Sequence, residues 1–256
     1  MEMKLPFKDN KLLEKVQGIV NEDEELNAVW EACNTMAVRR LGMSDHGKVH
    51  VSIVANIALK LLRNLKKEGV VPNIVSDYDF NFEDAEVVVV LASLLHDLGN
   101  SIHRDLHDEL GVLLANKFLN RILTELYDVK RKRQIVMTET MNAMVSHSEE
   151  IKVFTVEAGV VRLADALDME KGRARISFEK GKQDIHNVSA MSIEKVKISK
   201  GERPIMIEIL MNNPAGIFQV DYLLKKKLKG TGIEQYVEVR AIVKQEKENI
   251  ITEYKI

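Results

Sequence analysis

Residues 83–99 read EDAEVVVVLASLLHDLG, and this stretch decides the fold. Residues 87–90 alone would suit a strand, but the length of the apolar run favours a buried helix. Steps of four, three and four residues back from His96 meet Ala92, Val89 and Ala85. These residues are apolar, so His96 lies on the buried stripe of the helix. The following Gly99 is typical of a helix end. We therefore predict a buried helix that carries a histidine into the core.

Four other ionisable residues begin or end a similar apolar stripe, each on another predicted helix. They are His50, His107, His147 and Asp165. The helices are predicted over residues 11–20, 22–41, 50–65, 83–98, 106–126, 129–147 and 154–169, with a loop over 69–82. A buried charge is costly unless it is paired or coordinated. Asp165 in particular stands where a core residue is expected, so it needs a cation or strong hydrogen-bond donors.

The composition bounds the class of protein. A chain of 256 residues with 45 % hydrophobic residues can bury a substantial core, so global disorder is not expected. The net charge of -2 gives no reason to expect a nucleic acid or an anionic membrane as a partner. The single cysteine, Cys33, excludes an internal disulfide and a cysteine-built zinc cluster, and it fits a reducing compartment.

The N-terminal residues carry charges too frequently for a secretory signal. The longest uncharged apolar run, near residues 87–95, is about half of the roughly 18 residues that a membrane span needs. We therefore expect a cytoplasmic protein.

The sequence pattern changes after Gly172. Alternation of apolar and polar residues predicts strands over 192–199, 205–210 and 236–243, and 250–254 resembles a further strand. A helix is predicted from Pro214 to residue 228, because proline is favourable in the first turn. The chain thus divides into a mostly α domain over 1–175 and a small α+β domain over 176–256. Edge strands of the second domain could pair between chains, so a homodimer is one expectation.

The adjacent pair His96-Asp97 gives the sharper chemical signal. Imidazole nitrogen and carboxylate oxygen together suit borderline and hard divalent cations. A carboxylate can bridge two ions, whereas a neutral imidazole binds one. A hydrolytic water beside the pair would have its pKa lowered by the ion. We therefore take His96 and Asp97 as the candidate catalytic residues.

These motifs, in this order, resemble the HD superfamily of metal-dependent phosphohydrolases. The motifs are His50-x3-Val-Ala, Leu-Leu-His96-Asp97-Leu-Gly and Leu-Ala-Asp165-Ala-Leu-Asp. The resemblance spans roughly residues 45–175 and implies a helical bundle that holds a first metal through His50, His96, Asp97 and Asp165. His107 and His147 match the two extra histidines of the dinuclear subgroup, which implies a second metal bridged by Asp97. The metals expected are two divalent ions among Mn, Fe, Mg, Zn and Ni.

Two positions depart from the family pattern. Asn100 stands where many relatives carry a lysine. The run His147-Ser-Glu-Glu-Ile lacks the Gly-Tyr-Pro signature of relatives that cleave cyclic di-GMP, which argues against that substrate. The C-terminal α+β segment is not part of the general pattern, and the sequence assigns it no function.

Several residues compete for the same roles. His46 competes with His50, His103 with His107, and Asp168 with Asp165; the apolar stripes and family spacing favour the second residue of each pair. Arg162 could pair with Asp165, but it lies on a different face of its helix. Lys171 and Arg173 follow this helix and could neutralise a substrate phosphate, or simply complement the helix dipole. Residues 225–227, three lysines, are interpreted as a solvated face.

Three functions are consistent with this set of residues. The leading expectation is hydrolysis of a small-molecule phosphoester, plausibly a nucleotide or phosphodiester, by a metal-activated water. A second is a non-catalytic regulatory or scaffold protein that binds metal and nucleotide. The third is a di-iron oxygenase, since the same six ligands can serve oxygen chemistry.

Overall fold

The computed structural model describes residues 2–172, 185–244 and 251–255. Its helical part is built around α5 (Phe82–Leu95), whose residues are buried from Asp84 onward. α5 is enclosed because α1 (Lys11–Glu22), α3 (Lys48–Lys67), α7 (Lys130–Val145) and α8 (Val156–Leu167) pack around it. A helix that is apolar all round needs such enclosure. The structure thus confirms that residues 87–90 are helical, as expected within the helix predicted over 83–98.

The remaining helices of this part agree with the sequence pattern, with two differences. α2 (Glu24–Asn34) is separated from α1 by Asp23, and it continues as a π-helical turn over Thr35–Arg40. The predicted loop over 69–82 contains a short helix, α4 (Asn73–Tyr78). Backbone amides of Asn73 and Ile74 donate to the buried carboxylate of Glu157, so a distant side chain stabilises the first turn of α4. α6 (His107–Leu126) lies beside α7.

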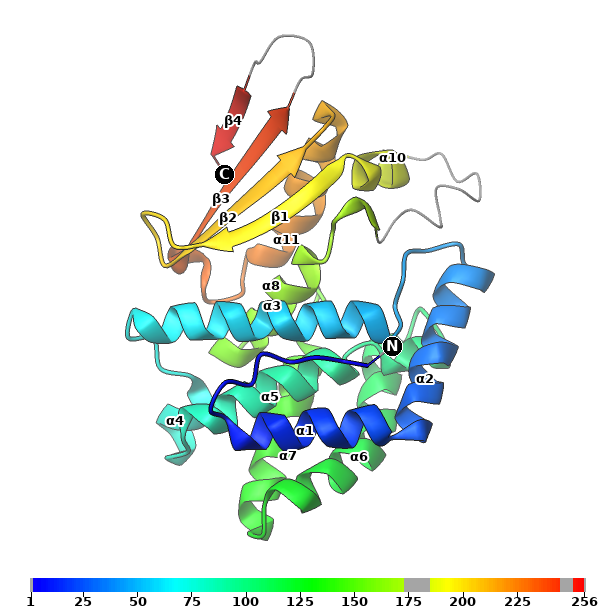
Figure 1. Cartoon of the computed structure of the whole chain (residues 1–256), viewed down its shortest axis with the longest axis vertical. Coiled ribbons are helices and arrows are strands. Elements are labelled where there is room, and N and C mark those ends of the chain that lie inside the picture. The colour runs from blue at the N-terminus through cyan, green and yellow to red at the C-terminus, as the bar shows by residue number, and fades with distance from the viewer. Residues whose placement is uncertain (1, 173–184, 245–250, 256) are drawn as a thin grey trace.

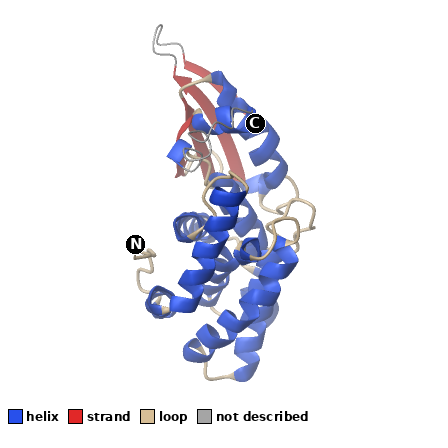
Figure 2. Ribbon diagram, turned by 90° about the vertical axis from the view of Figure 1, so that its right-hand side faces the viewer, coloured by secondary structure: helices blue, strands red, loops and turns tan. Residues whose placement is uncertain are grey.

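The C-terminal part is a sheet with helical segments on one face (Figures 1 and 2). The strands are β1 (Ile193–Ser199), β2 (Ile205–Met211), β3 (Val237–Lys244) and β4 (Ile251–Lys255), in this order across the sheet. β1 and β4 are antiparallel to their neighbours, whereas β2 and β3 are parallel. A parallel pair needs a crossover connection. The connection is helical and includes Pro214–Gly216, a π-helical turn over Gln219–Leu224, and α11 (Lys225–Leu228). The predicted mixture of strands and helix is confirmed.

The sheet lies against one end of the helical bundle, with α3 running beneath it (Figure 1). One cluster of buried apolar residues extends from the helices into the sheet, including Leu91 and Ile207. α10 (Ile185–Met191) precedes β1. The predicted boundary between residues 175 and 176 lies outside the described residues. Within the described chain, no helix combines the length and apolar character needed to cross a membrane.

Candidate metal centre

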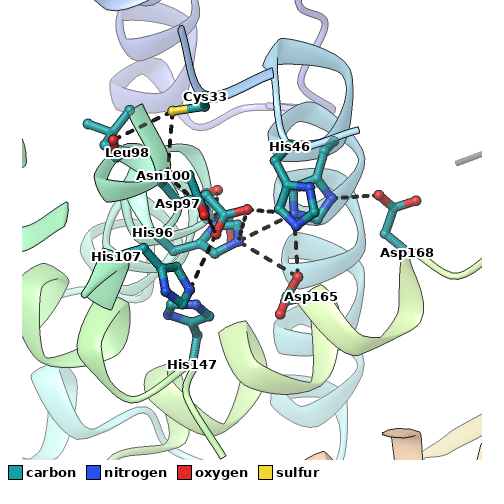
Figure 3. Close-up of polar contacts among 12 residues, drawn as sticks. Cys33, His46, His96, Asp97, Leu98, Asn100, His107, His147, Asp165 and Asp168 are labelled. Atoms are coloured by element: carbon teal, nitrogen blue, oxygen red, sulfur yellow. Dashed lines mark hydrogen bonds and ion pairs between the residues drawn. The ribbon is translucent and has the colours of Figure 1, made fainter. Parts of the chain in front are cut away.

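Five helices deliver the six predicted ligands to one place (Figure 3). His50 lies in the first turn of α3, and His107 is the first residue of α6. His96 and Asp97 come directly after α5, and His147 is the second residue after α7. Asp165 lies in the last turn of α8. These are helix ends, where side chains can meet without interrupting the packed middle of the bundle.

The first cluster is formed by two imidazoles and two carboxylates. Nε2 of His50 lies 3.3 Å from Oδ2 of Asp97 and 3.4 Å from Oδ1 of Asp165. Nε2 of His96 lies 3.4 Å and 3.7 Å from the same two oxygens. The two Nε2 atoms are 3.4 Å apart. Ligand atoms about 2.1 Å from a common ion are separated by roughly 3.0–3.5 Å, so these spacings fit one divalent cation.

The orientation of the rings supports this interpretation. Nδ1 of His96 lies 2.9 Å from the carbonyl oxygen of Ser93, and Nδ1 of His147 lies 2.6 Å from that of Met144. A carbonyl oxygen can only accept, so Nδ1 carries the hydrogen, and in a neutral ring Nε2 presents a lone pair. Nδ1 of His50 donates instead to Oδ2 of Asp168, at 2.6 Å. Such a contact behind the ligand fixes the ring and raises its basicity.

The electrostatics of the first cluster call for positive charge. Burial alone would lower the pKa of His96, but Asp97 and Asp165 outweigh it and raise the pKa to about 10. Burial likewise opposes ionisation of the two carboxyls. The charge of His96 beside Asp97, and of Lys227 beside Asp165, nevertheless holds the pKa of each carboxyl well below its usual range. Without a metal, a proton on His96 takes the place of the cation.

A second cluster adjoins the first through Asp97. Oδ1 of Asp97 lies 3.8 Å from Nε2 of His107. Oδ1 of Asp108 lies 3.3 Å from Nε2 of His107 and 3.3 Å from Nε2 of His147. Nδ1 of His107 is held by the carbonyl oxygen of Arg104, at 2.9 Å, so this ring too turns Nε2 toward the cluster. Asp97 therefore directs one oxygen to each cluster.

The surroundings of the Asp108 carboxylate show whether the second cluster can hold a metal ion. Its Oδ1 is a buried oxygen without a hydrogen-bond partner among the described residues. Lone pairs of two imidazoles face this oxygen, and burial lowers the pKa of both His107 and His147, that of His147 to about 3. Three acceptor atoms with no hydrogen between them repel one another, and a bound cation removes the repulsion. The residues present therefore fit a second divalent ion.

Comparisons with known proteins agree with this geometry. Residues 48–170 match the family model described as the HD domain, and all six predicted ligands lie within the match. The chain is 46 % identical over 227 residues to an uncharacterized protein of Methanocaldococcus jannaschii. That alignment covers 88 % of this chain and 87 % of its relative. The chain belongs to the HD-domain family. No solved structure gives a significant match to this HD-domain chain.

The competing residues lie around the HD-domain centre rather than inside it. His46 is buried with its ring centroid 5.6 Å from that of His50, and its Nδ1 contacts the carbonyl oxygen of Ser44. His103 is exposed and accepts a hydrogen bond from the Asp105 amide. Asp168 orients His50, as described above. Arg162 donates to the carbonyl oxygens of Ser146 and Ile151, so it supports the turn after α7.

Gly99 has a different role from the one the sequence suggested. α5 ends before it, and Gly99 does not adopt the left-handed conformation of a helix-ending glycine. A Cβ at this position would lie 2.0 Å from the carbonyl oxygen of His107. Gly99 therefore allows the first turn of α6, with His107 and Asp108, to approach the turn that follows Asp97.

The sequence suggested Lys171 and Arg173 as residues that could bind phosphate, and residues 225–227 as a solvated face. Nζ of Lys171 lies 3.7 Å from a carboxylate oxygen of Glu194, and its side chain is half exposed. Arg173 lies outside the described residues. The interpretation of residues 225–227 as a solvated face is wrong for Lys227, whose Nζ pairs with Oδ2 of Asp165. No local pattern signals this contact, because the two residues are far apart in the sequence.

Sequence analysis also missed Asp108, although a signal existed. His107-Asp108 repeats the adjacent pair His96-Asp97 on a second helix.

Cys33 lies on the other side of Asp97, with Sγ 3.5 Å from the carbonyl oxygens of Asp97 and Leu98. Burial, with the nearby charge of Asp97, raises the pKa of Cys33 to about 12, so it remains a thiol and not a thiolate ligand.

Both clusters open into a cavity of about 610 Å³. Four of the predicted ligands line it, together with Arg104 and Lys227; these ligands are Asp97, His107, His147 and Asp165. The volume lies within the range of small-molecule sites, about 300–1,000 Å³. The ligand atoms are therefore accessible to a small molecule.

Proposed function

We propose that this HD-domain protein is a metal-dependent phosphohydrolase with a dinuclear centre. The observation that carries the proposal is the division of Asp97 between two clusters of imidazole and carboxylate ligand atoms that adjoin one cavity. HD domains bind divalent metals, and the family consists generally of hydrolases, which supports the same conclusion.

Each residue of the centre has a separate role in this proposal. His50, His96, Asp97 and Asp165 would hold the first ion, and His107, Asp108 and His147 would hold the second together with Asp97. Asp168 orients His50. Asn100 donates to Oδ1 of Asp97 at 2.8 Å and accepts from Arg104 at 2.9 Å, so it links the bridging carboxylate to a cation in the cavity wall.

The proposed substrate is a small-molecule phosphoester, plausibly a nucleotide or phosphodiester. The bound ions would polarise a phosphoryl oxygen and supply a water of lowered pKa. Arg104 presents a guanidinium suited to phosphate oxygens.

Replacement of Asp97 tests the function. Asp97→Ala removes the carboxylate shared by both clusters, so we expect loss of bound metal and loss of hydrolysis of p-nitrophenyl phosphate, bis-p-nitrophenyl phosphate and a nucleotide panel. Asp128→Ala, at an exposed position distant in sequence from the centre, is the control and should retain both. Elemental analysis and phosphate release provide the measurements.

The outcomes separate the competing functions. Hydrolysis retained by Asp97→Ala would contradict the proposal. Stoichiometric metal without hydrolysis across the panel would favour a binding or regulatory role. Bound iron with oxygen consumption would favour a di-iron oxygenase.

A further inference from the structure

A lysine from the C-terminal part reaches the metal centre of the HD domain. Lys227 lies on α11, outside the residues that match the family model. Its Nζ pairs with Oδ2 of Asp165, while Oδ1 of the same carboxylate faces His50 and His96. The preceding lysines turn elsewhere: Lys225 lies 3.7 Å from a carboxylate oxygen of Asp221, and Lys226 lies over the ring of Tyr222.

The position of Lys227 is fixed by close packing of the chain that follows it. On α8, a Cβ at Gly159 would lie 2.2 Å from the carbonyl oxygen of Thr231. Thr231 is buried, and its hydroxyl donates to the carbonyl oxygen of Leu228 at 2.8 Å. The same helix thus carries Asp165 and the glycine against which the segment after α11 packs. This contact brings Lys227 to the centre as a built feature of the fold.

The charges of the cavity wall show what Lys227 adds. Among the described residues, six carboxylates line the cavity: Asp97, Asp108, Glu149, Asp165, Asp168 and Glu170. The lysine and arginine side chains of the described wall are those of Lys227 and Arg104. Even two divalent ions with Arg104 would leave this wall net negative without Lys227. A negative wall repels a phosphate group, so the charge of Lys227 removes the repulsion that would remain in the loaded cavity.

Lys227 also has N–H donors that its contact with Asp165 does not use. An ammonium group has three N–H donors. Its one hydrogen-bond partner within the described chain is Asp165, and about a quarter of the side chain is exposed at the cavity. It can therefore keep its contact with Asp165 and donate to an incoming oxygen.

We propose that Lys227 binds a phosphate oxygen of the substrate beside the first metal, so that the C-terminal part completes the binding site. The proposal rests on the function proposed above. It gives the α+β segment a role in recognition of the anion, together with Arg104 of the same cavity wall.

Phosphate binding tests this role. The full-length chain loaded with Mn²⁺ is titrated with inorganic phosphate in a calorimeter, as wild type, Lys227→Ala and Lys227→Arg. A charge-assisted hydrogen bond corresponds to roughly a tenfold to hundredfold change in affinity. We expect Lys227→Ala to weaken phosphate binding by this factor with unchanged metal content, and Lys227→Arg to restore most of it. Lys225→Ala removes the same charge from the same helix and should bind as wild type.

Other results would overturn the proposal. Phosphate affinity unchanged in Lys227→Ala, or absent in the wild type, would show that Lys227 is not an anion-binding residue. Loss of metal in Lys227→Ala would show that it only supports Asp165. Phosphate binding that depends on Lys227, in a wild type that hydrolyses no phosphoester, would contradict the proposed hydrolase function and leave the role of Lys227 intact.

Discussion

Three of the four histidines of the centre are oriented by a backbone group close to them in the sequence, whereas His50 is oriented by the side chain of Asp168. His96, His107 and His147 all contact the carbonyl oxygen three residues earlier. After α5, the last carbonyls have no partner within the helix, so the ring of His96 can donate to one of them. The same contact directs Nε2 into the centre. His96, directly after α5, thus caps this helix and at the same time turns Nε2 toward the other candidate ligands.

Asp108 yields a prediction about metal stoichiometry. Asp108→Asn replaces an oxygen that faces two imidazole lone pairs with a neutral amide, so we expect one Mn²⁺ fewer per chain and retention of the first ion. Elemental analysis after loading and desalting measures this difference. Asp105→Asn, an exposed aspartate of the preceding turn, should leave the content unchanged. Equal metal content in Asp108→Asn and wild type would remove Asp108 from the second cluster.

At the scale of elements, α8 both carries Asp165 of the candidate centre and packs against the C-terminal part of the chain. Its last turn carries Asp165, and its first half carries Gly159, which packs against the backbone of Thr231. The sequence predicted α8 correctly from its apolar stripe. It did not reveal the partner of Gly159, because helical periodicity shows which face is buried but not which segment covers it.

Gly159→Ala should disturb the packing of the segment after α11 against α8. The added methyl group would lie 2.2 Å from the Thr231 carbonyl oxygen, so the segment after α11 must move. We expect a loss of about 1–3 kcal/mol in the free energy of unfolding, measured by urea denaturation. Gly18→Ala, on the exposed face of α1 with no atom near the added Cβ, is the opposite case and should stabilise by about 0.5–1 kcal/mol. Equal stability of Gly159→Ala and wild type would argue against tight docking.

At the scale of the whole molecule, local patterns predicted most of the fold. Apolar periodicity located the principal helices, and alternation located the strands, because both reflect burial of one face. The clustering of His50, His96, Asp97, His107, His147 and Asp165 followed from buried stripes combined with family resemblance. The misses were long-range. The helix α4 depends on Glu157, and the contact of Lys227 with Asp165 joins two segments whose proximity only the tertiary structure creates.

Metal removal should change the stability of the whole chain. Ions that bind the folded centre stabilise it by mass action, about 2.7 kcal/mol at a concentration one hundred times the Kd. One kcal/mol corresponds to roughly 2–4 °C for a chain of this size. We therefore expect Mn²⁺ to raise the thermal midpoint by several degrees relative to EDTA, as measured by differential scanning fluorimetry. Asp97→Ala should not respond. Identical midpoints of the wild type in Mn²⁺ and EDTA would contradict a metal centre.

The parallel pairing of β2 with β3 has a consequence for the order of events during synthesis. The chain must complete the crossover that contains Lys227 before these strands can pair. Asp165, the last of the six predicted ligands, leaves the ribosome 62 residues earlier than Lys227. Because N-terminal segments fold first during translation, a nascent chain can gather its ligands before the lysine arrives. If the centre takes up its ions at that stage, the proposed anion site is completed only afterwards.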